Sequence, residues 1–134
     1  MEKQVIKFEE CNLSGNIKRA LLESGYIDAT PIQAESIPNI LEGKDVIGQS
    51  QTGTGKTAAY SLPILNKIDK NNKKVQAIIL CPTRELALQV VGEIRKFAKY
   101  EESVKSLQIK KKIDFRMCIE KYCLFLPHWK IYTK

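Results

Sequence analysis

The chain has 134 residues, of which 43% are hydrophobic and 28% are charged, a composition suited to one modest globular domain and not to a disordered segment. No apolar run approaches the length needed to cross a bilayer, and residues 1–10 lack the apolar core of a secretory signal. We therefore expect a cytoplasmic location and no membrane partner.

The formal net charge of +7 is unevenly distributed along the chain. Residues 1–104 carry 14 lysines and arginines against 13 acidic residues, whereas residues 105–134 carry 8 against 2. The basic excess is thus a property of the C-terminal segment, and it gives little support to a nucleic-acid interface elsewhere. The four cysteines have no disulfide-framework spacing, so we expect reduced thiols.

Two helices are predicted in the N-terminal third of the chain. Apolar residues at helical spacing predict a helix over residues 16–24, with Ser14 as its N-cap. A second helix should begin at Pro31, with Thr30 as its N-cap, and end at "LEGKD". Pro38 is expected to bend or interrupt this helix.

A strand, a loop and a helix are predicted next. The apolar run "DVIGQ" predicts a short strand, and "SQTGTGKT" (residues 50–57) leads from that strand into a helix that begins at Lys56. Pro63 is expected to end or kink this helix. Residues 66–74 are polar and rich in turn formers, so they form a connector.

Further elements complete an alternating pattern. Residues 75–81, "VQAIILC", predict a strand buried on both faces of a parallel sheet. A helix with Thr83 as its N-cap follows, and residues 103–109 are a candidate third strand. Alternating strands and helices predict an α/β fold with a parallel sheet and crossover helices. Ligands bind such sheets at the carboxyl ends of the strands, so "SQTGTGKT" and "PTREL" should open on the same edge.

The segment "SQTGTGKT" has the residues that a phosphate-binding loop needs. Gly53 and Gly55 permit close backbone approach, so the amides can form a concave anion site at a helix N-terminus. Lys56 can reach the β- and γ-phosphates, and the Thr57 hydroxyl can ligate Mg²⁺. The strict pattern starts with glycine, but Ser50 is small enough for that position. The alternative is a Gly-rich turn before a helix, which would not need the Lys-Thr pair.

Three ordered segments carry a resemblance to a known family. "QSQTGTGKT" resembles motif I of the DEAD-box RNA helicases. Residues 25–33, "GYIDATPIQ", are similar to the Q motif, with Phe8 at the spacing of its upstream aromatic residue, and residues 82–86, "PTREL", are similar to motif Ia. The resemblance covers residues 5–109 and implies part of a RecA-like P-loop domain that binds ATP, Mg²⁺ and RNA.

The resemblance also implies which residues bind the nucleotide. A glutamine side chain can pair with both N6 and N7 of adenine, so Gln33 would select ATP over GTP, and Phe8 would stack on the adenine. The alternatives are an exposed helical Gln33 and a core Phe8. The implied cofactor-binding residues are Phe8, Gln33, Ser50, Gln51, Thr52, Gly53, Thr54, Gly55, Lys56 and Thr57.

Contact with single-stranded RNA is implied at Pro82, Thr83 and Arg84. These residues stand at a helix N-terminus, where amides, a hydroxyl and a guanidinium group can meet a phosphate backbone. The alternative is capping by Thr83 and a solvated Arg84.

The family pattern stops after Ile109. Residues 110–134 match neither the Gly-Gly, Thr-Pro-Gly-Arg, Asp-Glu-Ala-Asp and Ser-Ala-Thr blocks nor a second RecA-like domain. We expect residues 1–109 to be the N-terminal part of a truncated RecA-like domain and residues 110–134 a divergent basic tail. A change of reading frame near Lys110 is our hypothesis for the break.

This break limits the expected activity. Phosphoryl transfer needs an acidic partner for Thr57 and a group that orients water, and unwinding needs two domains that close together. We therefore expect no ATP hydrolysis or RNA unwinding by the chain alone. Two alternatives stay open: a nucleotide- or RNA-binding module without turnover, and a non-functional product whose unpaired strand edges prevent folding.

The tail itself shows no clear site. Cys118, Cys123 and His128 are evenly spaced, but the spacing fits no usual zinc framework and a fourth ligand is missing, so we expect an accidental pattern. The lysines at 110–112 are expected to be a solvated charge run and not an RNA contact. The sequence fixes neither the RNA target nor the oligomeric state.

Overall fold

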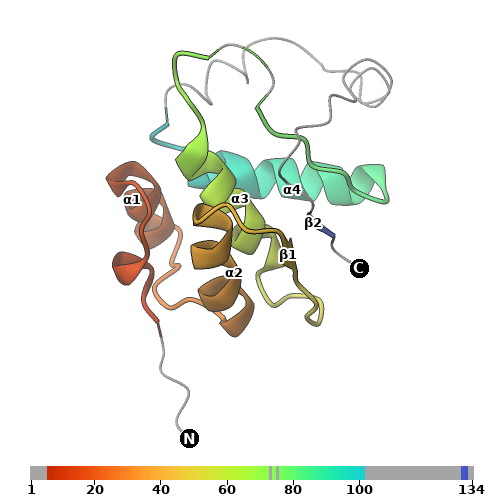
Figure 1. Ribbon diagram of the computed structural model, residues 1–134, viewed down its shortest axis with the longest axis horizontal. Coiled ribbons are helices and arrows are strands. Elements are labelled where there is room, and N and C mark those ends of the chain that lie inside the picture. Colours follow the sequence, from red (N-terminus) through yellow and green to blue (C-terminus); the bar gives the residue numbers. More distant parts are fainter. Residues whose placement is uncertain (1–5, 73, 75, 102–130, 133–134) are drawn as a thin grey trace, which may run out of the picture.

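The computed structural model describes residues 6–72, 74, 76–101 and 131–132 (Figure 1). The elements are, in chain order, the short 3-10 helix η1 (Phe8–Glu10), α1 (Gly15–Glu23), α2 (Pro31–Leu41), β1 (Val46–Ile47), α3 (Lys56–Lys67), α4 (Arg84–Phe97) and β2 (Ile131–Tyr132). This part of the chain is mainly helical. None of its helices combines the length and the apolar character of a membrane span.

Helices α1, α2 and α4 begin at the N-caps that are predicted from the sequence. At each start, a side chain accepts a hydrogen bond from a backbone N–H. Ser14 Oγ accepts a hydrogen bond from the N–H of Ile17 at the start of α1, at 3.3 Å. Thr83 Oγ1 accepts from the N–H of Leu86 at the start of α4, at 3.2 Å. At α2, the Gln33 side chain reaches back to the backbone of Thr30. Each bond satisfies a donor that the start of a helix leaves without an intrahelical partner.

Neither internal proline ends its helix. α2 continues past Pro38 to Leu41, and α3 continues past Pro63 to Lys67. The predicted interruption of the first helix and the predicted end of the second at Pro63 are therefore wrong. A proline inside a helix costs on the order of 3 kcal/mol because it removes one hydrogen bond and crowds the preceding turn. Extensive packing between α2 and α3, in which Pro63 is buried, offsets this cost.

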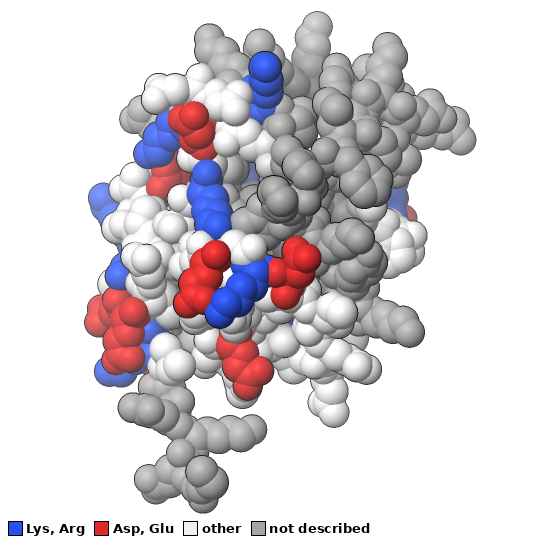
Figure 2. All heavy atoms as spheres, in the orientation of Figure 1, with Lys and Arg blue, Asp and Glu red and all other residues white. Residues whose placement is uncertain are grey.

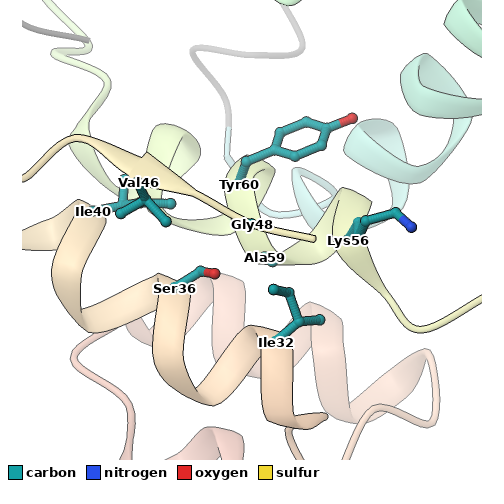
Figure 3. Close-up of a pocket in the computed structure, with 8 residues that line it drawn as sticks. All are labelled: Ile32, Ser36, Ile40, Val46, Gly48, Lys56, Ala59 and Tyr60. Atoms are coloured by element: carbon teal, nitrogen blue, oxygen red, sulfur yellow. The ribbon is translucent and has the colours of Figure 1, made fainter. Parts of the chain in front are cut away.

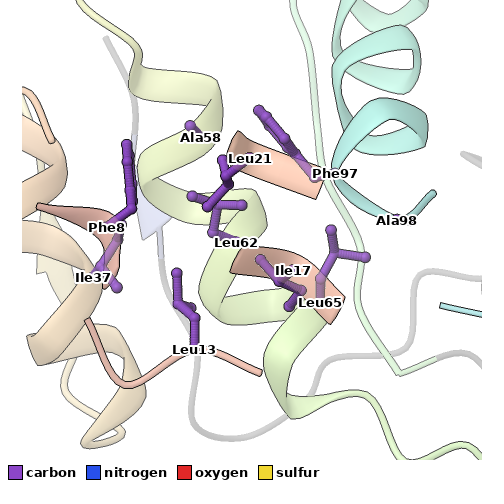
Figure 4. Packing of buried hydrophobic residues seen from close by; sticks show 10 residues of the cluster. All are labelled: Phe8, Leu13, Ile17, Leu21, Ile37, Ala58, Leu62, Leu65, Phe97 and Ala98. Carbon is purple, nitrogen blue, oxygen red and sulfur yellow. The ribbon is translucent and has the colours of Figure 1, made fainter. Parts of the chain in front are cut away.

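The hydrophobic core lies where the helices meet (Figure 4). Ile17 and Leu21 from α1, Leu62 from α3 and Phe97 from α4 have no exposed surface. The whole cluster is Phe8, Leu13, Ile17, Leu21, Ile37, Ala58, Leu62, Leu65, Phe97 and Ala98. Burial of one such large side chain contributes about 1.5–3 kcal/mol, so this cluster fixes α3, and the loop before it, against α1 and α2.

The strands are short. β1 and β2 pair in parallel, with Val46 opposite Ile131 and Ile47 opposite Tyr132. A parallel pair combined with the order strand, loop, helix is the predicted α/β class.

Residues 75–81 are predicted to form a strand. Residues 76–81, the part that the structure describes, do not form one. Residues 76–81 have no strand partner among the described residues. The predicted burial is also wrong, because Ile78 is 45% exposed and Leu80 is 74% exposed. A strand is held by hydrogen bonds to a neighbour, and an apolar run without one stays irregular. The candidate strand 103–109 lies outside the described residues.

Candidate functional site

The loop between β1 and α3 contains two glycines in the left-handed region. Gly53 has a φ of +78° and Gly55 a φ of +81°, a conformation that residues with a Cβ rarely adopt. A Cβ on Gly55 would also lie only 2.2 Å from Nε2 of Gln33. Position 55 therefore requires glycine both for its backbone angle and for its packing.

The backbone amides of this loop are available to an anion. Among the contacts of the described residues, no N–H group of residues 51–55 donates a hydrogen bond. These amides precede α3, whose 12 residues place a partial positive charge at its N-terminus. Unpaired amides at a helix N-terminus are the donor set that phosphate groups prefer.

The ammonium group of Lys56 lies over the loop. Its Nζ donates to the carbonyl oxygen of Ser50 and, at 2.8 Å, to that of Gln51. In this arrangement the loop's own carbonyl oxygens compensate the lysine charge.

Two hydroxyl groups join the ends of the same loop. Ser50 Oγ and Thr54 Oγ1 are 2.6 Å apart, and Thr54 Oγ1 donates to the carbonyl oxygen of Gln51 at 2.8 Å. The loop is therefore closed on itself by side-chain contacts as well as by Lys56.

The N-terminus of α2 holds the loop from the other side. Gln33 is 1% exposed, so the interpretation of an exposed helical glutamine is wrong. Its Oε1 accepts from the N–H of Thr30 at 2.9 Å, and its Nε2 donates to the carbonyl oxygen of Gly55 at 3.0 Å. Thr30 Oγ1 donates to the carbonyl oxygen of Thr54 at 2.9 Å. Gln33 and Thr30 thus connect the start of α2 to the loop, the two regions that are predicted from the sequence to share one nucleotide site.

Phe8 lies in the hydrophobic core. Its side chain belongs to the core cluster, the residue is 2% exposed, and its ring meets that of Tyr26 edge-on with centroids 6.4 Å apart. The backbone of Phe8 also donates to the carbonyl oxygen of Ile27 at 3.1 Å, close to the start of α2. This is the core position weighed above as the alternative, and stacking on an adenine stays a prediction.

Pro82, Thr83 and Arg84 are exposed where α4 begins. The alternative interpretation of this segment was capping by Thr83 and a solvated Arg84. The structure contains the capping bond of Thr83. On the face shown in Figure 2, lysine and arginine side chains alternate with acidic ones over the described part of the molecule.

Comparison with known families identifies the chain. The family model described as DEAD/DEAH box helicase matches residues 30–123. The chain belongs to this family. The match includes "SQTGTGKT" and "PTREL" and begins just before Gln33.

Curated DEAD-box relatives agree with this assignment. An ATP-dependent RNA helicase CshA from Limosilactobacillus reuteri is 55% identical over 94 residues, which cover 70% of this chain and 19% of the relative. A CshA from Listeria monocytogenes is 50% identical over 103 residues, which cover 77% of this chain and 20% of the relative. The chain thus spans about a fifth of the length of these relatives.

Solved structures show the same similarity. A DEAD box protein from the hyperthermophile Methanococcus jannaschii superposes with a TM-score of 0.65 at 42% identity, covering 68% of this chain and 25% of that one. A hypothetical ATP-dependent RNA helicase from Sulfolobus tokodaii gives 0.59 at 38% identity, covering 66% and 25%.

Thr57 is the predicted magnesium ligand of this DEAD-box chain, and it lies in the first turn of α3. Burial raises the pKa of Tyr60 in the same turn, and the hydroxyl of Thr57 opposes that rise. The described residues contain no group of three or more His, Cys, Asp or Glu side chains that could hold a metal ion. Cys118, Cys123 and His128 lie outside them.

A cavity between α2, β1 and α3 is too small to be the nucleotide site (Figure 3). Its volume is about 20 Å³, which is room for one water molecule. Its lining residues are Ile32, Ser36, Ile40, Val46, Gly48, Lys56, Ala59 and Tyr60. In Figure 3 the end of the Lys56 side chain points away from the other lining side chains.

The contact between Thr30 and Thr54 was not predicted, because the sequence indicates Thr30 only as an N-cap. The Thr-x-x-Gln spacing is that of a capping box, and it could have indicated that Gln33 folds back on Thr30. The bonds to Thr54 and Gly55 cross 24 and 22 residues and have no local signal.

Proposed function

We propose that this chain is the N-terminal portion of a DEAD-box ATP-dependent RNA helicase that binds ATP with Mg²⁺ through Gln33 and residues 50–57. One observation carries the proposal. Among the contacts of the described residues, no amide of residues 51–55 donates a hydrogen bond, Gly53 and Gly55 in this segment are left-handed, and the Lys56 ammonium bonds to carbonyls of the same loop. This donor set matches the oxygens of a triphosphate in charge and in hydrogen-bonding capacity.

Lys56 would change partners when phosphate is present. Its ammonium group would leave the carbonyl oxygens of Ser50 and Gln51 and bind β- and γ-phosphate oxygens, which carry full negative charge. Thr57 would contribute its hydroxyl to Mg²⁺. The metal ion, when bound, would neutralise charge on the phosphates.

Gln33 keeps the atoms needed to recognise adenine. Its Oε1 has two lone pairs, of which Thr30 uses one, and its Nε2 has two hydrogens, of which Gly55 uses one. The remaining lone pair and hydrogen are the groups that N6 and N7 of adenine require. Because Gln33 is buried and Phe8 is 2% exposed, adenine recognition would require a shift of η1 away from the start of α2.

RNA would bind at the start of α4. Pro82, Thr83 and Arg84 are exposed, and the helix N-terminus favours phosphate. The chain would bind both ligands through these groups.

The test of ATP binding is calorimetric titration of the full chain with Mg-ATP. We expect saturable binding that weakens at least roughly tenfold in Lys56→Ala, since a charge-assisted phosphate contact is lost. Lys44→Ala is the matched control, because the side-chain partners of Lys44 among the described residues are Glu42 and Asn39, which lie outside the loop. No binding by the wild-type chain, or equal weakening in both variants, would contradict the proposal.

Two further titrations test the recognition groups. Gln33→Ala should reduce the preference for ATP over GTP. Arg84→Ala should weaken binding of a single-stranded RNA oligonucleotide, whereas the exposed Arg95→Ala on the same helix should leave it unchanged. Equal effects of the two arginine substitutions would indicate non-specific attraction of RNA to positive charge.

A further inference from the structure

Ser50 occupies the one position where this loop departs from the strict glycine-initiated pattern, and its hydroxyl has a defined partner. Ser50 Oγ lies 2.6 Å from Thr54 Oγ1. A threonine hydroxyl has one hydrogen, and Thr54 gives it to the carbonyl oxygen of Gln51 at 2.8 Å. Ser50 is therefore the donor, and the bonds run from Ser50 through Thr54 to Gln51.

These bonds contract the loop. Residues 50 and 54 are four positions apart along the chain, and their side-chain oxygens are in contact. The amides of residues 51–54 lie within the segment that these bonds close, and the Lys56 ammonium bonds to carbonyl oxygens of the same segment. A phosphate group that binds these amides would draw the Lys56 ammonium away from the carbonyl oxygens, and the two ends of the loop would move apart to admit it.

We propose that the Ser50 hydroxyl is a latch that favours the closed, phosphate-free form of the loop and so lowers nucleotide affinity. This inference rests on the proposed function, because it concerns the same loop. Alanine at position 50 cannot donate this bond, so it destabilises the closed form while the open form keeps all its phosphate donors. The apparent affinity falls as more molecules adopt the closed form, which does not bind nucleotide. Loss of the latch lowers the closed fraction and so raises the apparent affinity.

The expected result is a gain of affinity. In calorimetric titrations of the full chain with Mg-ADP, Ser50→Ala should bind roughly two- to ten-fold more tightly than the wild type, which is the range for loss of one net hydrogen bond. In stopped-flow experiments the gain should appear in the association rate and not in the dissociation rate, since the open form is unchanged. A purely structural role for Ser50 would leave affinity unchanged or weaken it.

A double-mutant cycle identifies the partner. Thr54→Val keeps the branched shape but removes the hydroxyl, so it should also tighten binding. Ser50→Ala added to Thr54→Val should then have no further effect. Ser24→Ala, an exposed serine at the end of α1, is the matched control and should bind as the wild type does.

The outcomes separate this inference from the proposed function. Binding by the wild type with equal or weaker binding by Ser50→Ala overturns the latch alone. Independent, additive effects of the Ser50 and Thr54 substitutions also overturn it. Absence of Mg-ADP binding in the wild type and in Ser50→Ala overturns both the latch and the nucleotide site.

Discussion

Two regions of the molecule differ in how their apolar side chains are covered. In the helical half, formed by η1, α1, α2, α3 and the C-terminal part of α4, Ile37 and Leu62 have no exposed surface. In the strand half, formed by β1, β2 and residues 76–81, Ile47 is 79% exposed and Leu80 is 74% exposed. The loop of residues 50–55 connects β1 of the strand half to α3 of the helical half. Thr30 and Gln33 of the helical half hold it by hydrogen bonds. The contacts that hold residues 50–55 in place therefore come from the start of α2, whereas residues 76–81 have no strand partner among the described residues.

A leucine substitution in each half gives the largest expected contrast. Leu62→Ala should reduce the free energy of unfolding by about 2–5 kcal/mol, because it removes buried methyl groups and leaves a cavity. Leu80→Ala should change it by no more than about 0.5 kcal/mol, as for other exposed positions. Urea denaturation of both variants measures the difference. Similar losses of unfolding free energy in the two variants would show that the side chain of Leu80 is buried in solution.

A second comparison isolates the contact between α2 and the loop. Gly43→Ala and Gly55→Ala both place a Cβ at a positive φ, +87° and +81°. Gly43 has open space around it, so its substitution should cost about 1–2 kcal/mol from the backbone alone. Gly55→Ala should cost about 1–3 kcal/mol more, because its Cβ would collide with Gln33. Urea denaturation measures both, and equal costs would mean that Gln33 does not support the loop.

The same contrast explains what could be predicted from sequence. Helix starts at Ser14, Thr30 and Thr83 follow from local capping chemistry, and the loop follows from glycine and lysine spacing. The continuation of α2 past Pro38 depends on packing against α3, which no local pattern records. Residues 76–81 read as a buried strand because their composition is apolar, but burial requires a neighbouring strand.

Buried Gln33 and the hydroxyl pair Ser50 and Thr54 show a further limit. Residue types in a motif indicate which ligand it binds. They do not indicate which of its polar atoms are already used within the protein. Gln33 was predicted to recognise adenine, and the structure shows the same side chain holding Thr30 to Gly55. Only the geometry separates the atoms that remain free.

Two helix caps provide a smaller contrast. Ser14 caps α1 and also donates to the buried carboxylate of Glu101 at 3.1 Å, whereas the Thr83 hydroxyl bonds only to the N–H of Leu86 in the described part of the chain. Both alanine variants should lose about 0.5–2 kcal/mol of stability, with Ser14→Ala nearer the upper value. The measurement is again urea denaturation. A larger loss in Thr83→Ala would show that α4 depends on its cap more than the helical half depends on Ser14.

The smallest expected effect concerns pH at the surface of the helical half. Hydrogen bonds from Lys99 first, then Tyr100, lower the pKa of Glu23 to about 2 from 4.5. Because the folded pKa lies below the unfolded one, this contribution is fully present above about pH 4.5 and is lost as pH falls toward 2. Glu23→Gln should therefore show a slightly shallower loss of stability over this range than the wild type. Thermal unfolding at several pH values measures it, and identical pH profiles would contradict the shift.

Amide chemical shifts of the full chain during titration with Mg-ADP test the central claim most directly. The nucleotide should first perturb the backbone amides of residues 51–57 and the side-chain amide of Gln33, while residues 76–81 remain nearly unchanged. Perturbation that spares this loop, or that is centred on the basic residues after position 104, would contradict the assignment of the site.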